Sequence, residues 1–168
     1  MVRLSDAIVL ATVATGAGTG AAIDLWTRRV PNPLTVLLAS TGVAFAACGI
    51  SGLTVGASLA GFLLGLALML PGHLFGATGA GDVKFFAAMG AIIGPAHIAT
   101  AFVYTAMAGG AIAVIVSLRR KRLQQTLAGT ARLLGSSAAD ALDSPLANNR
   151  FAYAPAIAVG TMVAALGW

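Results

Sequence analysis

Charged residues are scarce in this chain of 168 residues, and their scarcity excludes the soluble classes of protein. Only 9% of the residues are Asp, Glu, Lys or Arg, against roughly 25% in an average soluble domain. Hydrophobic residues make up 58% of the chain, and the mean hydropathy is +0.92. A soluble domain of this size could not cover so much apolar surface. The composition therefore predicts an integral membrane protein.

Two further absences limit the chemistry. The chain has no Glu, so its acidic residues are five aspartates: Asp6, Asp24, Asp82, Asp140 and Asp143. Its one cysteine, Cys48, excludes an internal disulfide and a four-cysteine zinc site. We expect Cys48 to be a small buried residue inside the second span. We also expect His73 and His97 on opposite faces of the membrane, where they cannot share a metal.

Four stretches carry no Asp, Glu, Lys or Arg, and two of them are too long for a single helix. A helix rises 1.5 Å per residue and the hydrocarbon core is about 30 Å thick. We expect breaks at 49–52 and at Gly94-Pro95, a helix opened by Pro31-Asn32-Pro33, and another closed by Pro71-Gly72. The fold class is therefore all-α, a polytopic membrane protein of six transmembrane helices over residues 7–23, 34–48, 53–70, 81–93, 96–118 and 151–168. A cleaved signal peptide at the N-terminus is the alternative for the first of these.

The basic residues indicate the orientation. If the N-terminus and the C-terminus both lie on the outer, periplasmic side, nine of the ten Lys and Arg residues fall on the inner side. This is the positive-inside bias of membrane proteins. It explains the sequence pI of 10.4 better than nucleic-acid binding does.

We expect the whole chain, residues 1–168, to form a single membrane-embedded domain. Between the fifth and sixth spans lies a cytoplasmic linker, residues 123–149. Its apolar residues recur at spacings of three and four, which favours an amphipathic helix on the inner membrane surface. A loosely ordered loop is an equally good interpretation of its glycines and serines.

The topology brings two aspartates to the same depth. Asp24 ends the first span and Asp82 begins the fourth, both at the inner surface. Two close carboxylates share a proton, so one can act as general base on a water while the other protonates the carbonyl under attack. The alternative is structural, with Asp24 paired to Arg28 and Asp82 serving as a helix N-cap. Lys84 lies about 200° around the helix from Asp82, so we expect it to face lipid headgroups or a substrate.

Three motifs resemble one family. Residues 79–84, Gly-Ala-Gly-Asp-Val-Lys, resemble the Gly-x-Gly-Asp signature of polytopic aspartic proteases, in the form found in type IV prepilin peptidases. Asp24 followed by Arg-Val-Pro-Asn at 29–32 is similar to the first motif of that family. Tyr-Ala-Pro at 153–155 is similar to its aromatic–proline start of the last span.

The resemblance implies that Asp24 and Asp82 are the catalytic pair of an aspartic endopeptidase. The enzyme would remove the basic leader of prepilin or pseudopilin precursors, its partners, at the cytoplasmic face of the bacterial inner membrane, with no cofactor and no metal. The residues expected to bind substrate or shape the site are Gly79, Gly81, Lys84, Pro31 and Asn32. The chain lacks the cytoplasmic segment with paired cysteines of larger relatives, so it resembles the short, peptidase-only branch of Flp (Tad) pili without methyltransferase activity.

Three other functions fit parts of the sequence. A small transporter or proton channel could use Asp24 and Asp82 as ion relays, although such relays are expected nearer the bilayer midplane. A non-enzymatic assembly subunit would use Gly-Asp only as a turn. An intramembrane Gly-x-Gly-Asp protease would cut other substrates within the bilayer.

Overall fold

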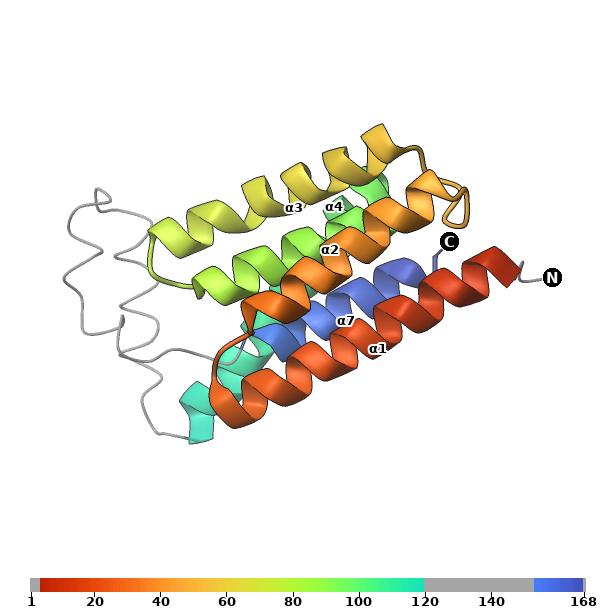
Figure 1. Cartoon of the computed structure of the whole chain (residues 1–168). Helices are drawn as coiled ribbons and strands as arrows, with labels where there is room; N and C mark the ends of the chain where they lie inside the picture. The colour runs from red at the N-terminus through yellow and green to blue at the C-terminus, as the bar shows by residue number, and fades with distance from the viewer. Residues whose placement is uncertain (1–3, 120–152, 168) are drawn as a thin grey trace.

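The computed structural model describes residues 4–119 and 153–167, and these residues form helices joined by short turns, with no strand. The predicted all-α class is confirmed. The linker at 123–149 and the basic cluster at 120–122 lie outside the described residues. The helices are α1 (Leu4–Thr27), α2 (Asn32–Ala47), α3 (Val55–Leu74), α4 (Ala80–Arg119) and α7 (Ala154–Ala165) (Figure 1).

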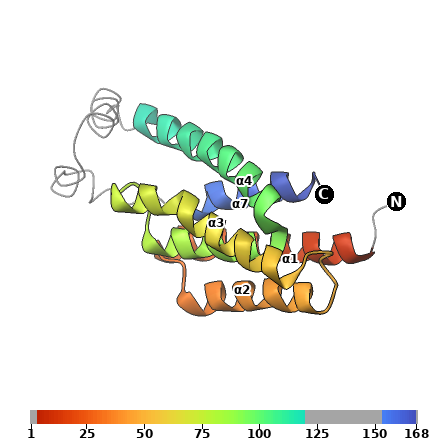
Figure 2. The ribbon, with the colours of Figure 1, turned by 90° about the horizontal axis from the view of Figure 1, so that it is seen from above.

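The chain reverses direction inside α4. Gly94 has φ 76° and ψ 175°, a backbone conformation that is unfavourable for any residue with a Cβ atom. Pro95 follows it. The part before Gly94 and the part after it run in opposite directions (Figures 1 and 2). The predicted break at Gly94-Pro95 is therefore confirmed. Because of this turn, successive helical segments alternate in direction and both termini lie at the same end of the bundle (Figure 1).

The first part of α4 is the centre of the core. Its residues from 85 to 94 are buried, and Phe85, Phe86 and Met89 are wholly inaccessible. Helices α2, α3 and α7 pack around α4, while α1 packs chiefly on α7. A Cβ atom on Gly61 of α3 would collide with the carbonyl oxygen of Gly90. Such close backbone approach at small residues is the usual way in which membrane helices pack.

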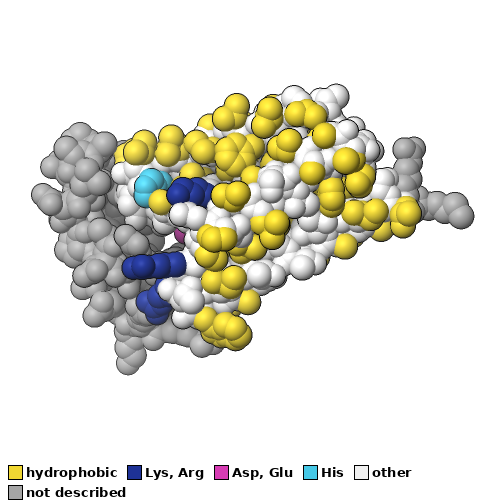
Figure 3. Space-filling view, viewed as in Figure 1, with side chains coloured by type: hydrophobic (Ala, Val, Ile, Leu, Met, Phe, Trp, Pro, Cys, Tyr) yellow, Lys and Arg dark blue, Asp and Glu magenta, His cyan; other side chains and the backbone are white. Residues whose placement is uncertain are grey.

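The outer surface of the bundle is apolar. Leu59, Leu63 and Leu74 of α3 are among many large exposed hydrophobic side chains, and apolar side chains cover much of the face shown in Figure 3. Three helical stretches are long and apolar enough to cross a membrane: Leu4–Thr27, Val55–Leu74 and Ala80–Ile112. Helices α2 and α7 are apolar but shorter, with 16 and 12 residues. The chain is thus a multi-pass membrane protein.

Two local expectations are wrong. Pro71 does not end the third helix, since α3 continues to Leu74. Proline removes only its own N–H, and the chain beyond it is held by the bond from the N–H of Phe75 to the carbonyl of Pro71. Cys48 is not buried but exposed, because α2 ends one residue earlier and Cys48 is its C-cap.

Candidate active site

Asp24 lies in the last turn of α1 and its side chain is only 4% exposed. Its Oδ2 accepts a hydrogen bond of 3.2 Å from the backbone N–H of Ala154. Ala154 is the first residue of α7, and the N-terminus of a helix favours a negative charge. A carboxylate at the end of one helix is thus held by the start of another.

Asp82 lies in the first turn of α4 and is 6% exposed. Its Oδ2 accepts a hydrogen bond of 3.1 Å from the backbone N–H of Gly79, the residue before the helix. This is one half of a capping box, in which the side chain of the third helical residue accepts a hydrogen bond from the backbone N–H of the N-cap residue. The alternative of Asp82 as the N-cap itself is wrong, because the cap position belongs to Gly79.

The turn between α3 and α4 fixes the position of Gly79. The N–H groups of Ala77 and Thr78 both donate to the carbonyl of Gly72, at 2.8 and 3.1 Å. The Nδ1 atom of His73 lies 3.0 Å from the carbonyl oxygen of Thr78. These bonds tie the turn to the end of α3 and so fix the residue that precedes Gly79, the donor to Asp82.

The two aspartates lie within electrostatic reach of each other. The negative charge of Asp24 acts on Asp82, and the positive charge of Arg28 acts on Asp24. Among the residues that the structure describes, no ion-pair contact joins Arg28 to Asp24. Among the described residues, each carboxylate has one oxygen bonded to a backbone N–H, and none of these residues bonds to the other oxygen, which is available to a water or a substrate.

Tyr153, the N-cap of α7, packs its ring against α4. Its ring fills the space that Gly109 leaves, because a Cβ atom there would lie 2.6 Å from the tyrosine Cε2. Burial, and after it the negative charge of Asp82, raises the pKa of the Tyr153 phenol above its ordinary value of 10.0. Helices α1, α4 and α7 therefore meet at the two carboxylates.

The predicted site-shaping residues lie around this meeting point. The backbone N of Val30 would lie 3.3 Å from a Cβ on Gly81, so the segment before α2 passes directly against the first turn of α4. Pro31 is the N-cap of α2. The exposed Lys84 donates a hydrogen bond of 3.2 Å to the side-chain oxygen of Asn32. This bond joins the starts of α2 and α4.

Basic side chains surround the site. Arg28, Arg29 and Lys84 are all exposed, and Figure 3 shows Lys, Arg and His side chains gathered at this end of the bundle, with an acidic side chain visible between them. Arg28 has φ 52°, a left-handed conformation that is uncommon outside glycine. Its N–H donates to the carbonyl of Asp24 at 2.7 Å, so this strained residue follows the end of α1, one turn after the aspartate.

The sequence did not reveal the N–H of Ala154. A backbone donor has no residue type by which to recognise it, and only the resemblance at 153–155 pointed to this part of the chain. As for a metal, the described residues contain no group of three or more His, Cys, Asp or Glu side chains that could hold one.

Comparison with known families identifies the chain. The model of the type IV leader peptidase family matches residues 8–114, a segment that includes Asp24, Asp82 and the residues around them. No curated protein and no solved structure matches the chain. The family match covers more than half of the sequence, so the chain belongs to the type IV leader peptidase family.

Proposed function

We propose that this protein is an aspartic endopeptidase in which Asp24 and Asp82 form the catalytic pair. The observation that carries the proposal is the placement of the pair: two buried carboxylates from different helices, within electrostatic reach of each other. Buried acids need compensation, and from the part of the chain that the structure describes each receives a single backbone N–H. That is enough to orient an acid while leaving one of its oxygens open.

The proposed chemistry needs one shared proton. One carboxylate removes a proton from a water molecule whose oxygen attacks the carbonyl carbon of the scissile peptide bond, while the protonated partner donates its proton to the carbonyl oxygen. The tetrahedral intermediate then collapses. Its C–N bond breaks as the leaving nitrogen takes up the proton that came from the water. Every transfer runs between the substrate, the water and the two aspartates.

Membership of a leader peptidase family favours this chemistry over a transporter, a channel or an assembly subunit. We propose that the substrates are precursors of Flp-type prepilins with a basic leader, cut at the cytoplasmic face of the inner membrane. All six helical segments would span the membrane within one domain, with both termini outside. Arg28 and Arg29 follow the end of α1, and Lys84 lies near the start of α4. These two helix ends lie at the end of the bundle that this orientation puts inside (Figure 1).

The test is leader cleavage in cells that co-express the chain with a prepilin bearing a basic leader. Asp24→Asn and Asp82→Asn preserve the shape of the side chain and a hydrogen-bond acceptor but remove the acid. We expect each to lower the cleavage rate by at least about a hundredfold, since general acid–base catalysis contributes about 10²–10⁴. Cleavage is read from the shift in mass of the pilin.

Asp6→Asn is the matched control, because Asp6 lies in the first turn of α1, at the opposite end from Asp24. It should cleave like the wild type. Equal amounts of each variant in the membrane, measured by immunoblot, exclude loss of the protein as the cause. Cleavage that survives either Asp24→Asn or Asp82→Asn would show that the pair is not catalytic.

A further inference from the structure

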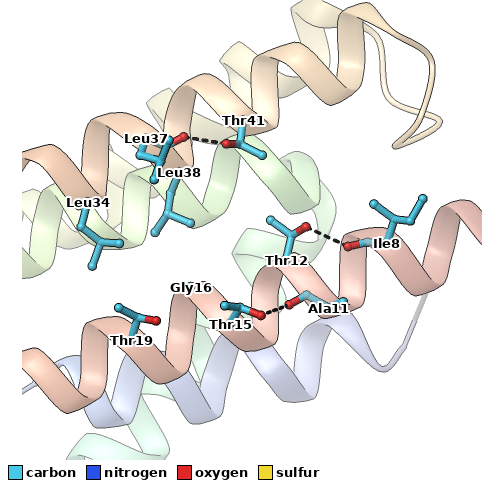
Figure 4. Close-up of a pocket in the computed structure, with 10 residues that line it drawn as sticks. All are labelled: Ile8, Ala11, Thr12, Thr15, Gly16, Thr19, Leu34, Leu37, Leu38 and Thr41. Atoms are coloured by element: carbon cyan, nitrogen blue, oxygen red, sulfur yellow. Dashed lines mark hydrogen bonds between the residues drawn. The ribbon is translucent and has the colours of Figure 1, made fainter.

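Tyr153 lies beyond the segment that matches the family, and it brings a side-chain hydroxyl to the region of the aspartate pair. It directly precedes Ala154, whose backbone N–H donates to Asp24. Helix α7 packs on α1 and α4, and Figures 1 and 4 show it running beside α1. The negative charge of Asp82 reaches the phenol. Tyr153 is thus tied to one carboxylate through the backbone and lies within electrostatic reach of the other.

The ring of Tyr153 is held in place, while its hydroxyl is not used by the fold. The side chain is partly buried against the core, and the edge of the ring lies over Gly109. A Cβ atom on Gly109 would lie 2.6 Å from Cε2 and 2.8 Å from the phenolic oxygen. Within residues 4–119 and 153–167, no group forms a hydrogen bond with that oxygen. A packed tyrosine hydroxyl usually has a partner, so a positioned donor is available here for a further molecule.

The two carboxylates do not depend on this hydroxyl. Asp24 and Asp82 are each oriented by a backbone N–H. The phenol also does not compete for the proton that the pair shares. Its ordinary pKa is 10.0, and burial and the charge of Asp82 raise that pKa further, so it is protonated at neutral pH. The phenol is therefore a neutral donor that keeps its own proton.

We propose that the hydroxyl of Tyr153 donates a hydrogen bond to the carbonyl oxygen of the scissile peptide bond, as a third catalytic residue beside Asp24 and Asp82. This inference rests on the proposed function. The carbonyl oxygen gains negative charge as the water attacks, until the protonated aspartate supplies its proton. A donor that is already in position stabilises this charge. The phenolic proton stays on the tyrosine oxygen, so no bond to Tyr153 forms or breaks.

Tyr153→Phe tests the inference, because it removes the hydroxyl and keeps the ring that packs on Gly109. We expect kcat on the full precursor, measured with purified protein in lipid vesicles, to fall by about a hundredfold, the usual cost of losing one such donor. KM should stay unchanged, since the bond strengthens only in the transition state. Tyr104→Phe, the same exchange on the exposed side of α4, should leave kcat and KM at the wild-type values.

A second measurement separates this role from a structural one, because a partly misfolded sample would also lower kcat alone. Tyr153→difluorotyrosine keeps the hydroxyl and nearly the size of the ring but lowers the pKa of the phenol. Once ionised, the phenolate can no longer donate to the carbonyl oxygen. The alkaline decline of kcat should therefore move to lower pH than in the wild type. Tyr104→difluorotyrosine should leave the pH profile unchanged.

Three results would overturn the inference. They are a wild-type kcat for Tyr153→Phe, a change of KM alone, which would make the hydroxyl a group that binds the ground state, and an alkaline decline that stays in place in Tyr153→difluorotyrosine. Each would leave the role of the aspartate pair intact. Cleavage by Asp24→Asn or Asp82→Asn would instead overturn the proposed function, whatever the tyrosine variants show.

Discussion

At the scale of single residues, the two aspartates are oriented by backbone and not by side chains. Asp24 accepts from the first N–H of α7 and Asp82 from the N–H before α4. A backbone donor does not titrate and cannot be lost by substitution of its side chain. Its position depends on the packing of the whole helix that it begins. We therefore expect the pair to be sensitive to substitutions that shift the start of α7.

Gly109 allows us to test this dependence. The Tyr153 ring occupies the space next to it, so Gly109→Ala should displace the ring and, with it, the adjoining N–H of Ala154. Overpacking of this kind costs about 1–3 kcal/mol of unfolding free energy. We expect a lower thermal midpoint. We also expect a cleavage rate at least about tenfold lower, because a hydrogen bond to a charged group contributes about 1.5–3 kcal/mol and about 1.36 kcal/mol of activation free energy is a factor of ten.

Gly110→Ala is the neighbouring control, since a Cβ at Gly110 meets nothing within 4 Å. It should leave the cleavage rate unchanged and, because alanine is the better helix former, should not lower the midpoint. Equal cleavage by the two alanine variants would mean that the start of α7 does not position the pair.

Tyr153 also gives the protein a dependence on alkaline pH. Its pKa is raised in the folded state by burial and by Asp82, so the folded protein retains the phenolic proton where the unfolded chain has lost it. The resulting stability is complete below the ordinary pKa of 10.0 and is lost as the pH rises through the folded-state pKa. Thermal midpoints measured from about pH 8 to pH 11 should fall more steeply for the wild type than for Tyr153→Phe.

Tyr104→Phe, on the exposed side of α4, is the control for that series and should follow the wild type. Identical curves for the wild type and Tyr153→Phe would contradict the assignment of the alkaline loss to Tyr153.

The sequence selects candidate residues for the site but does not predict their contacts. Residue type, helix parity and the family motifs selected Asp24 and Asp82 and the glycines beside them. None of these signals predicts that Lys84 donates a hydrogen bond to Asn32. Nor do they predict that the Asp82 side chain accepts one from the backbone N–H of Gly79. Such contacts depend on how helices distant in sequence are placed, and hydropathy carries no information about that.

At the scale of helices, the core depends on how closely α3 and α4 approach. Gly61 and Gly90 face each other with no room for a Cβ on either. Gly61→Ala should therefore separate the two helices and lower the unfolding free energy by about 1–3 kcal/mol. Gly56→Ala, on the same helix with only a distant neighbour, should be neutral or stabilising by up to about 1 kcal/mol.

Unfolding of the detergent-solubilised variants, followed by circular dichroism, measures both effects. If Gly61→Ala unfolds with the same midpoint as Gly56→Ala, then the close approach at Gly61 does not stabilise the bundle.

The helix boundaries show which sequence signals are dependable. Glycines with positive φ end segments where expected, at Gly49, Gly52 and Gly94, because the chain needs those conformations to turn. Proline is the weaker signal. Pro33 and Pro155 lie in the first turns of their helices, yet Pro71 lies inside the end of α3. A proline removes one hydrogen bond, and a helix near its end can continue without it.

At the scale of the whole molecule, alternation of the helical segments divides the protein into two ends. The aspartate pair, Lys84 and the two arginines lie at or beside the end of α1 and the start of α4. These helix ends lie at one end of the bundle, and both termini lie at the other (Figure 1). Cys48 is the C-cap of α2, whose first residue Asn32 bonds to Lys84. Cys48 therefore lies at the end of the bundle away from the pair, where it is exposed.

The single cysteine makes the orientation measurable. If the basic end faces the cytoplasm, as the positive-inside bias predicts, a membrane-impermeant maleimide should label Cys48 from the periplasmic side of spheroplasts. In the Cys48→Ser/Arg29→Cys variant, labelling should require permeabilised membranes, because residue 29 lies beside the carboxylate pair. The opposite pattern would put Asp24 and Asp82 outside the cell. The proposed cytoplasmic cut would then be impossible, even if the pair were catalytically competent.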